Sequence, residues 1–147
     1  MKSLSWKSLV ALGMSALAVA GSSVGVALAS HGANQKVLVD TYGNLRLRIV
    51  ESEYVPKAEE PRFDSGWHTH PGLAIVQVKS GTFEITQNGC TATTVGPGQT
   101  YIEIPNTPVR AVSQGAIKWT TTLLLWNTAG SAVASPPAAT TVSSPCP

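Results

Sequence analysis

The sequence predicts an all-β domain in which short strands close into a sandwich or a barrel. Segments rich in β-forming residues recur between residues 36 and 126, and clusters of glycine, proline and asparagine separate them. No stretch of useful length between residues 30 and 130 has the apolar period of about 3.6 residues that marks a helix. About eight or nine short strands at this spacing are typical of sandwiches and barrels.

The segment 45–50 has the clearest strand pattern, because aliphatic and basic residues alternate along it. Successive side chains of a strand point to opposite faces of the sheet. We therefore expect the aliphatic residues to face the core, and Arg46 and Arg48 to form a charged outer edge that discourages aggregation. The expected core residues are Leu45, Leu47 and Ile49.

Turn signals bound the other strands. The polar, proline-bearing segment 57–65 is expected to be a loop. Lys79-Ser80-Gly81 is typical of a hairpin turn, and Asn88-Gly89 is a second turn signal. Seven of the predicted strands have clear bounds, which in chain order are 36–40, 45–50, 73–79, 82–86, 101–104, 109–112 and 116–126.

The two ends of the chain differ in composition from the domain between them. Residues 1–29 join a basic start, an apolar run and Ala27-Leu28-Ala29, which is the pattern of a cleaved signal peptide. The alternative is an uncleaved membrane anchor. We expect a domain over 30–128 and a Ser/Ala/Pro-rich tail over 129–147. The mature protein is then secreted or periplasmic, with no stable membrane insertion after signal cleavage.

The charge balance argues against nucleic acid as a partner. Removing 29 residues from the 147-residue chain leaves 118, which carry eight basic and eight acidic side chains. No basic cluster remains to neutralise a phosphate backbone. The sequence also has neither a G-x-S-x-G nucleophile motif nor a phosphate-binding glycine loop.

Two cysteines, Cys90 and Cys146, are present in a chain that is predicted to be exported. An even count in an oxidising compartment favours a disulfide that ties the tail to the domain. Two separate thiols are the alternative.

Two of the three histidines, His68 and His70, lie two positions apart. On a strand this spacing places both imidazoles on the same face, and imidazole is the commonest side-chain ligand of metals. The pair therefore predicts a metal site, although a stable one requires further ligands. The alternative is that both histidines are polar residues of a barrel pocket that form hydrogen bonds and hold no metal.

Two motifs around this pair resemble those of the cupin superfamily. The first runs from Gly66-Trp67-His68-Thr69-His70-Pro71 through an apolar strand to Gly81, and the second joins Gly96-Pro97-Gly98 to Ile104-Pro105. The chain is most similar to small exported single-domain cupins, over residues 40–126. The resemblance implies a small jelly-roll β-barrel. It also implies that metal-binding members hold one ion with two histidines and a glutamate from the first motif and a histidine from the second.

Carried onto this sequence, the resemblance supplies only half of that ligand set. The two first-motif histidines match His68 and His70, but the glutamate falls on Ala74 and the last histidine falls on Val109 or Arg110. Neither valine nor arginine is a plausible ligand.

Glu103 is the nearest replacement acid in the sequence. Its neighbours Ile102 and Ile104 resemble a core face, which predicts that Glu103 points outward and that no carboxylate reaches both imidazoles.

Other residues are candidates for lining a ligand pocket, with core or rim positions as the alternative. They are Trp67, Tyr101, Trp119 and Trp126. Arg110 is a candidate partner for an acidic ligand, and a solvated strand face is its alternative.

Two function classes follow. The first is a binding module that holds a small molecule, such as a sugar or an organic acid, in the barrel mouth, with a divalent transition metal (Mn, Fe, Ni, Cu or Zn) weakly held by His68 and His70. The alternative is a metal-dependent cupin enzyme of the dioxygenase, isomerase or lyase type. The fold does not select between them. Catalytic residues are not assigned, and a homodimer is left open.

Overall fold

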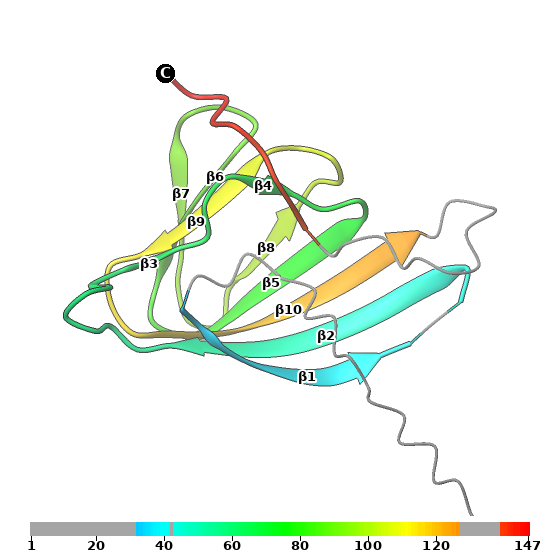
Figure 1. Ribbon diagram of the computed structural model, residues 1–147, viewed down its shortest axis with the longest axis horizontal. Helices are drawn as coiled ribbons and strands as arrows, with labels where there is room; N and C mark the ends of the chain where they lie inside the picture. Colours follow the sequence, from blue (N-terminus) through cyan, green and yellow to red (C-terminus); the bar gives the residue numbers. More distant parts are fainter. Residues whose placement is uncertain (1–31, 42, 127–138) are drawn as a thin grey trace, which may run out of the picture.

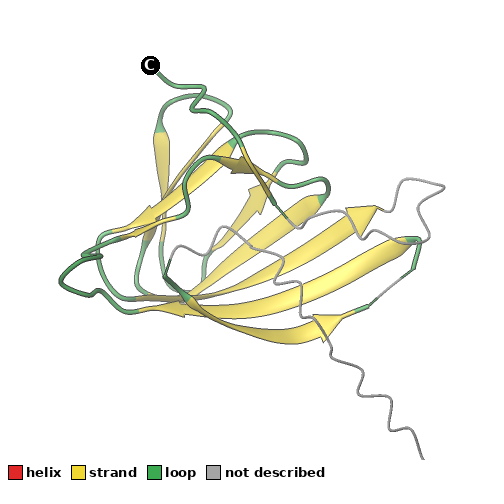
Figure 2. Ribbon diagram, viewed as in Figure 1, coloured by secondary structure: helices red, strands yellow, loops and turns green. Residues whose placement is uncertain are grey.

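The computed structural model describes residues 32–41, 43–126 and 139–147, which form strands and loops without a helix (Figure 2). The predicted signal peptide and the first ten residues of the predicted tail lie outside the described residues. The strands are β1 (Asn34–Asp40), β2 (Leu45–Tyr54), β3 (Phe63–Asp64), β4 (His68–Thr69), β5 (Leu73–Ser80), β6 (Phe83–Gln87), β7 (Ala92–Val95), β8 (Thr100–Glu103), β9 (Val109–Ser113), β10 (Ile117–Trp126) and β11 (Thr140–Thr141).

These strands form two antiparallel sheets that face each other (Figure 1). One sheet has five strands in the order β1-β2-β10-β5-β8. The other has six, in the order β11-β4-β9-β6-β7, with β3 also paired to β9. The all-β prediction is confirmed. The predicted loop over 57–65 is interrupted by the two-residue strand β3, which the sequence pattern did not signal.

Aromatic side chains fill the space between the sheets. Phe63, Phe83 and Trp119 are buried, and the Trp119 ring centroid lies 5.0 Å from the centroid of each phenylalanine ring. Tyr54 packs edge-on against Phe63 at 5.6 Å. Tilted and edge-to-face pairs at such distances add to the stability that comes from burying the rings. Phe63, Phe83 and Trp119 of this cluster also line the cavity that is described in the next subsection.

Strand β2 presents the opposite face to the core from the one its sequence predicts. Arg46 and Arg48 are buried, at 3% and 8% exposure, whereas Leu45 is 48% exposed. Arg46 donates from Nε and Nη2 to the two carboxylate oxygens of Asp40, at 2.7 and 2.8 Å. The carboxylate on the adjacent strand β1 makes a buried guanidinium tolerable. Strand β2 also lies between β1 and β10, so the prediction of a charged outer edge is wrong.

The turn at Gly81 is predicted correctly, but the hairpin is not. Gly81 has φ of +77°, and a Cβ there would lie 2.4 Å from the carbonyl oxygen of Ala116. The strands on either side belong to different sheets, so the chain crosses at this turn from one sheet to the other. The Asn88-Gly89 turn does join two paired strands, β6 and β7.

The end of the chain returns to the domain. Thr140 and Thr141 of β11 pair with Thr69 and His68 of β4. Cys90 and Cys146 form the predicted disulfide, with Cα atoms 5.6 Å apart. Among the described residues there is no helix of the length and apolarity needed to cross a membrane.

Candidate functional site

His68 and His70 lie on the inner side of the short strand β4 and just after it. Both are buried, at 5% and 4% exposure, and their ring centroids are 4.9 Å apart. His68 Nδ1 lies 3.1 Å from the carbonyl oxygen of Gly66. A carbonyl can only accept, so this contact places the proton on Nδ1 and the lone pair on Nε2. Metal-binding histidines are commonly oriented by such a bond from their other nitrogen.

The third member of the site is Glu103, which the strand pattern of the sequence predicts to point away from the core. Its side chain is only 3% exposed, and its Oε2 lies 2.9 Å from His70 Nε2. The isoleucines on either side are exposed instead, Ile102 at 55% and Ile104 at 43%. The prediction that Glu103 points outward is therefore wrong. Its carboxylate reaches His70, and one of its oxygens lies within 4.8 Å of a ring nitrogen of His68.

Two hydrogen bonds fix the chain around Glu103. Ile104 N donates to Gln87 Oε1 on strand β6 at 3.1 Å, which links the two sheets across the core. Asn106 N donates to the carbonyl oxygen of His70 at 2.8 Å. Both hydrogen bonds join segments that are distant in sequence, so no local sequence pattern predicts them.

Glu103 compensates for the alanine at the expected glutamate position. Strand β8 pairs with β5 so that Glu103 lies directly opposite Ala74. Directly opposed residues point to the same face of a sheet. A carboxylate therefore enters the site from the neighbouring strand, over the small side chain of Ala74. The single signal for this in the sequence is that Glu103 lies directly before the Ile104-Pro105 motif.

The position at which the family resemblance implies a fourth ligand, a histidine, is apolar in this chain. Val109 is fully buried and lies opposite His68 in the pairing of β4 with β9. Arg110 points to the other face and donates from Nε to Asp64 Oδ1 at 2.8 Å and from Nη2 to Oδ2. These bonds hold the pKa of Asp64 below its usual value and raise that of Arg110. The guanidinium is thus engaged by a carboxylate of the chain itself.

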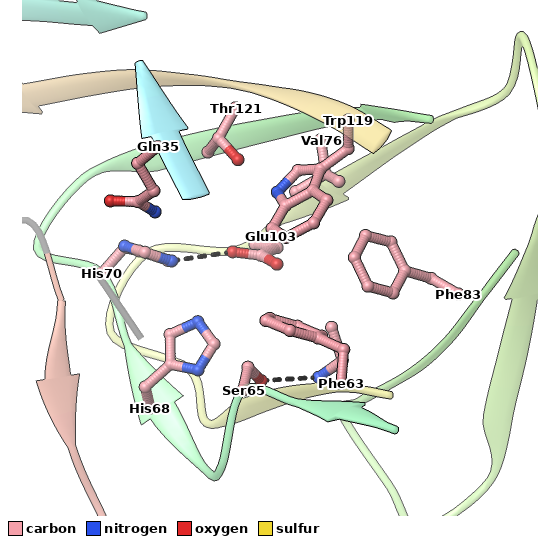
Figure 3. A pocket seen from close by; sticks show the side chains of 11 residues that line it. Gln35, Phe63, Ser65, His68, His70, Val76, Phe83, Glu103, Trp119 and Thr121 are labelled. Carbon is pink, nitrogen blue, oxygen red and sulfur yellow. Dashed lines mark hydrogen bonds and ion pairs between the residues drawn. The ribbon is translucent and has the colours of Figure 1, made fainter. Parts of the chain in front are cut away.

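The three side chains together form a donor set that suits a metal ion. One ligand atom from each of His68, His70 and Glu103 lies within 4.8 Å of the other two, and all three residues are buried (Figure 3). Apart from its contact with His70, Glu103 Oε2 has no hydrogen-bond partner among the described residues. Two imidazoles and one carboxylate are the ligands of non-haem iron sites and suit other divalent transition metals.

These side chains open into a small cavity between the sheets, as Figure 3 shows. About 50 Å³ of it is open to the centres of water molecules. Of the predicted aromatic residues, Trp119 lines this cavity, whereas Trp126 is 56% exposed and Trp67 lies in a surface groove beside Arg110. The cavity is lined by Gln35, Phe63, Ser65, His68, His70, Val76, Phe83, Glu103, Ala111, Trp119 and Thr121.

Comparison with known proteins identifies the fold. No protein-family model matches the sequence, and no curated protein matches it. Solved structures do match. One is a cupin superfamily protein from Desulfitobacterium hafniense, 12% identical with a TM-score of 0.55, over 63% of this chain and 77% of that one. Another is an uncharacterised conserved protein with a double-stranded β-helix domain from Klebsiella pneumoniae, 21% identical with a TM-score of 0.53, over 65% and 75%.

KdgF from Halomonas is similar to the same degree, with 20% identity and a TM-score of 0.52 over 67% of this chain and 83% of that one. At such identities the likeness concerns the fold, and function has to be argued from the site. The predicted jelly-roll architecture is confirmed. The chain has the cupin fold, as its two motifs predicted.

Proposed function

We propose that this protein binds one divalent transition-metal ion through His68, His70 and Glu103, and that the bound ion holds a small carboxylate in the cavity. The observation that carries the proposal is the convergence of the three buried ligand atoms within 4.8 Å. A buried carboxylate oxygen beside two imidazoles is costly to maintain unless a cation or a hydrogen-bond donor compensates it.

The charge of the site supports an anionic ligand. A divalent ion held by one carboxylate and two neutral imidazoles leaves the centre with one positive charge. Three protein ligands also leave coordination positions open toward the cavity. Gln35, Ser65 and Thr121 line the same cavity and can donate hydrogen bonds to a carboxylate.

The cavity volume limits the size of this ligand. A volume of about 50 Å³ accommodates a few water molecules, because the centre of each water molecule needs about 10–15 Å³ of open space. Sites for drug-sized molecules measure roughly 300–1,000 Å³. This favours a small organic acid over an enclosed sugar.

Metal titration tests the first part of the proposal. Protein stripped with a chelator is titrated calorimetrically with Mn, Fe(II), Ni, Cu and Zn, and we expect one ion per chain for at least one metal. Glu103→Gln, which keeps the shape of the side chain but removes its charge, should weaken binding at least about tenfold, because even the loss of a residue that only supports a ligand costs about 10–100-fold. The matched control is Glu84→Gln, at an exposed glutamate of β6, and it should bind like the wild type. Failure of all five metals to bind stoichiometrically would refute the proposal.

The ligand is tested on the cobalt-loaded protein. Acetate added to it should change the visible absorption of Co(II) when a carboxylate enters an open position. An unchanged spectrum up to high millimolar acetate would refute carboxylate binding while leaving the metal site intact.

A metal-dependent enzyme is the second candidate, and the open coordination positions favour it. A substrate that binds such a position is polarised by the metal acting as a Lewis acid.

If exported, as the disulfide supports, the protein works outside the cytoplasm. Mass spectrometry of the mature protein tests the proposed export. Removal of residues 1–29 is expected, and an intact N-terminus would contradict cleavage of a signal peptide.

A further inference from the structure

The cavity beside the candidate metal site has a polar wall on strand β10. Trp119 and Thr121 lie two residues apart on this strand, and both side chains line the cavity. Side chains at this spacing share one face of a strand. Both residues are buried, at 6% and 8% exposure. Figure 3 shows the indole nitrogen of Trp119 on the side of the ring that is turned toward Thr121. We call Trp119 and Thr121 the donor wall.

Both members of the donor wall have a hydrogen to donate. An indole N–H can only donate, and a hydroxyl carries one donor hydrogen. In the part of the chain that the structure describes, neither Trp119 Nε1 nor Thr121 Oγ1 has a hydrogen-bond partner. A buried donor without an acceptor costs free energy. An oxygen atom that enters the cavity beside the donor wall is therefore stabilised there.

The indole ring has a fixed orientation. Its centroid lies 5.0 Å from the ring centroids of Phe63 and Phe83, at interplanar angles of 57° and 75°. Both phenylalanines are buried. Close packing on two sides prevents the indole from turning toward another acceptor, so its N–H stays directed at the cavity.

Ser65, another polar residue of the cavity, is already engaged. Its Oγ donates to the carbonyl oxygen of Gly66 at 2.9 Å and accepts from Ala111 N at 2.9 Å. Gln35 is exposed, and its Nε2 donates to Ser52 Oγ at 3.5 Å. The donor wall is thus the buried part of the cavity surface that is left to hydrogen-bond a ligand outside the proposed metal ligands.

The donor wall carries no charge. Among the described residues that line the cavity, Glu103 is the charged one when both imidazoles are neutral. A second carboxylate of a ligand would therefore lie at the wall without a cation beside it, which is costly in a buried site. The wall suits an uncharged oxygen, such as that of a hydroxyl or carbonyl group.

We propose that the donor wall selects the ligand of the metal site. The ligand is a short carboxylic acid whose other end carries an uncharged oxygen that accepts hydrogen bonds from Trp119 and Thr121. This rests on the proposed binding of a carboxylate to the metal ion, and it adds the chemistry of the ligand's other end.

The selection follows from the hydrogen bonds that a ligand replaces. Water that enters the cavity satisfies the two donors, and a ligand that displaces it must offer an acceptor in its place. An acid with an apolar end offers none, so it loses affinity. Sites that hydrogen-bond a ligand oxygen discriminate strongly against an analogue that lacks it.

Two acids of matched size test the proposal. 3-Hydroxypropionate and butyrate differ in having a hydroxyl or a methyl group at the same end. Each is titrated into the cobalt-loaded wild-type protein and followed by the visible absorption of Co(II). We expect 3-hydroxypropionate to bind about tenfold more tightly, because butyrate leaves the donors unpaired. Trp119→Phe keeps an aromatic ring without the N–H, and Thr121→Val replaces the hydroxyl by a methyl group. Each should reduce this ratio severalfold.

The matched controls lie on the same strand and point away from the cavity. Trp126→Phe alters a tryptophan that is 56% exposed, and Thr122→Val alters the neighbour of Thr121 on the opposite face. Both should keep the wild-type ratio of the two affinities. Circular dichroism and Tm report the fold of every variant.

An NMR measurement on the wild type covers a folding failure of the variants. The indole N–H signal of Trp119 is assigned through its contacts with Phe63 and Phe83. In the zinc-loaded protein, 3-hydroxypropionate should move the indole proton downfield, and butyrate should not.

The outcomes separate this proposal from the metal site. Equal affinities of the two acids for the wild type would overturn the donor wall and leave the metal-bound carboxylate standing. A preference that persists in folded Trp119→Phe and Thr121→Val would also overturn it, since the hydroxyl then binds elsewhere. Failure of both acids to bind would refute the proposed carboxylate function, and this proposal with it.

Discussion

At the residue scale, the site keeps two histidines and one glutamate as possible metal ligands. The glutamate does not come from the position that the family resemblance predicts. Ala74 and Val109 hold alanine and valine where the family resemblance expects ligands. The carboxylate reappears at Glu103, opposite Ala74 on the neighbouring strand. Among the described residues no fourth donor joins this cluster, and Val109 is packed in the apolar core. The candidate site in this part of the chain therefore has three possible donors rather than four.

Restoring the fourth donor is a direct test of this interpretation. Val109 lies opposite His68 on the same face, so Val109→His adds an imidazole beside the three proposed ligands. We expect at least a tenfold gain in metal affinity, because sites with four protein ligands are closed and tight. A competition titration against a chromogenic chelator measures it.

The control for that experiment is Val109→Leu, which changes volume without adding a donor. An equal gain in both variants would show that packing, and not coordination, is responsible. A folded Val109→His protein with unchanged affinity would contradict the placement of Val109 at the metal.

At the element scale, one glycine allows two chain segments to approach closely beside the site. Gly72 follows His70 by two residues, and a Cβ at Gly72 would lie 2.0 Å from the carbonyl oxygen of Leu124 on β10. The three nearest atoms belong to the backbone of Leu124 and Leu125, so no side-chain rotation relieves the clash. The absence of a side chain at Gly72 therefore allows the close approach of the two chain segments.

Gly72→Ala should destabilise the fold by about 3 kcal/mol, because the two backbones must separate. Urea unfolding measures the change. Gly115→Ala is the matched control, since its Cβ would meet no atom within 4 Å, and it should leave stability nearly unchanged. Equal stability of the two variants would show that the contact at Gly72 relaxes at little cost.

The C-terminal strand is a second element that supports the site. β11 pairs with β4, which carries His68, and Val142 N donates to the carbonyl oxygen of Trp67 at 3.0 Å. The disulfide holds this segment in place. His68 thus lies on a strand with neighbours on both sides, β9 and β11.

Replacing both cysteines, Cys90→Ser with Cys146→Ser, should lower the free energy of unfolding by up to about 4 kcal/mol in the chain-entropy model. Thermal unfolding with and without a dithiol reductant checks the result. The reductant should destabilise the wild type to the level of the double variant and leave the variant unaffected. A wild type whose Tm is insensitive to complete reduction would contradict the tether.

At the scale of the whole molecule, stability should fall in acid because two carboxylates are held by arginines. The pKa of Asp40 is lowered mainly by its hydrogen bonds with Arg46, and that of Asp64 mainly by those with Arg110. A carboxyl whose pKa is lower in the folded state than in the unfolded chain stabilises the fold above the unfolded value. That contribution is lost as the pH falls through the folded value.

We therefore expect Tm to be steady near neutrality and to decline as the pH falls below about 4. Asp64→Asn should have a lower Tm than the wild type at pH 7, and the gap should narrow as the pH falls through the lowered folded-state pKa of Asp64. A gap that is independent of pH would show that the Asp64–Arg110 pair does not contribute through its charge.

The sequence alone determined the architecture and half of the site. Strand alternation, turn residues and the two motifs predicted an all-β jelly roll, and the spacing of His68 and His70 predicted two imidazoles on one face. The pairing of Cys90 with Cys146 also followed from the cysteine count. The strands, the turns and the histidine spacing depend on local geometry, the jelly roll on the two motifs, and the disulfide on the number of cysteines. All of them can be predicted without knowing which distant segments meet.

The tertiary structure alone decided which face of each strand is inside. Alternation states that Leu45, Leu47 and Ile49 share a face, but either face of a strand can be buried. Leu45, Leu47 and Ile49 of β2 lie on the outer side, while Arg46 and Arg48 are buried beside Asp40 of the neighbouring strand. Glu103 lies inside because strand register places it opposite Ala74 and because Ile104 N donates a hydrogen bond to Gln87. Contacts between distant segments therefore determined where the carboxylate of the site lies.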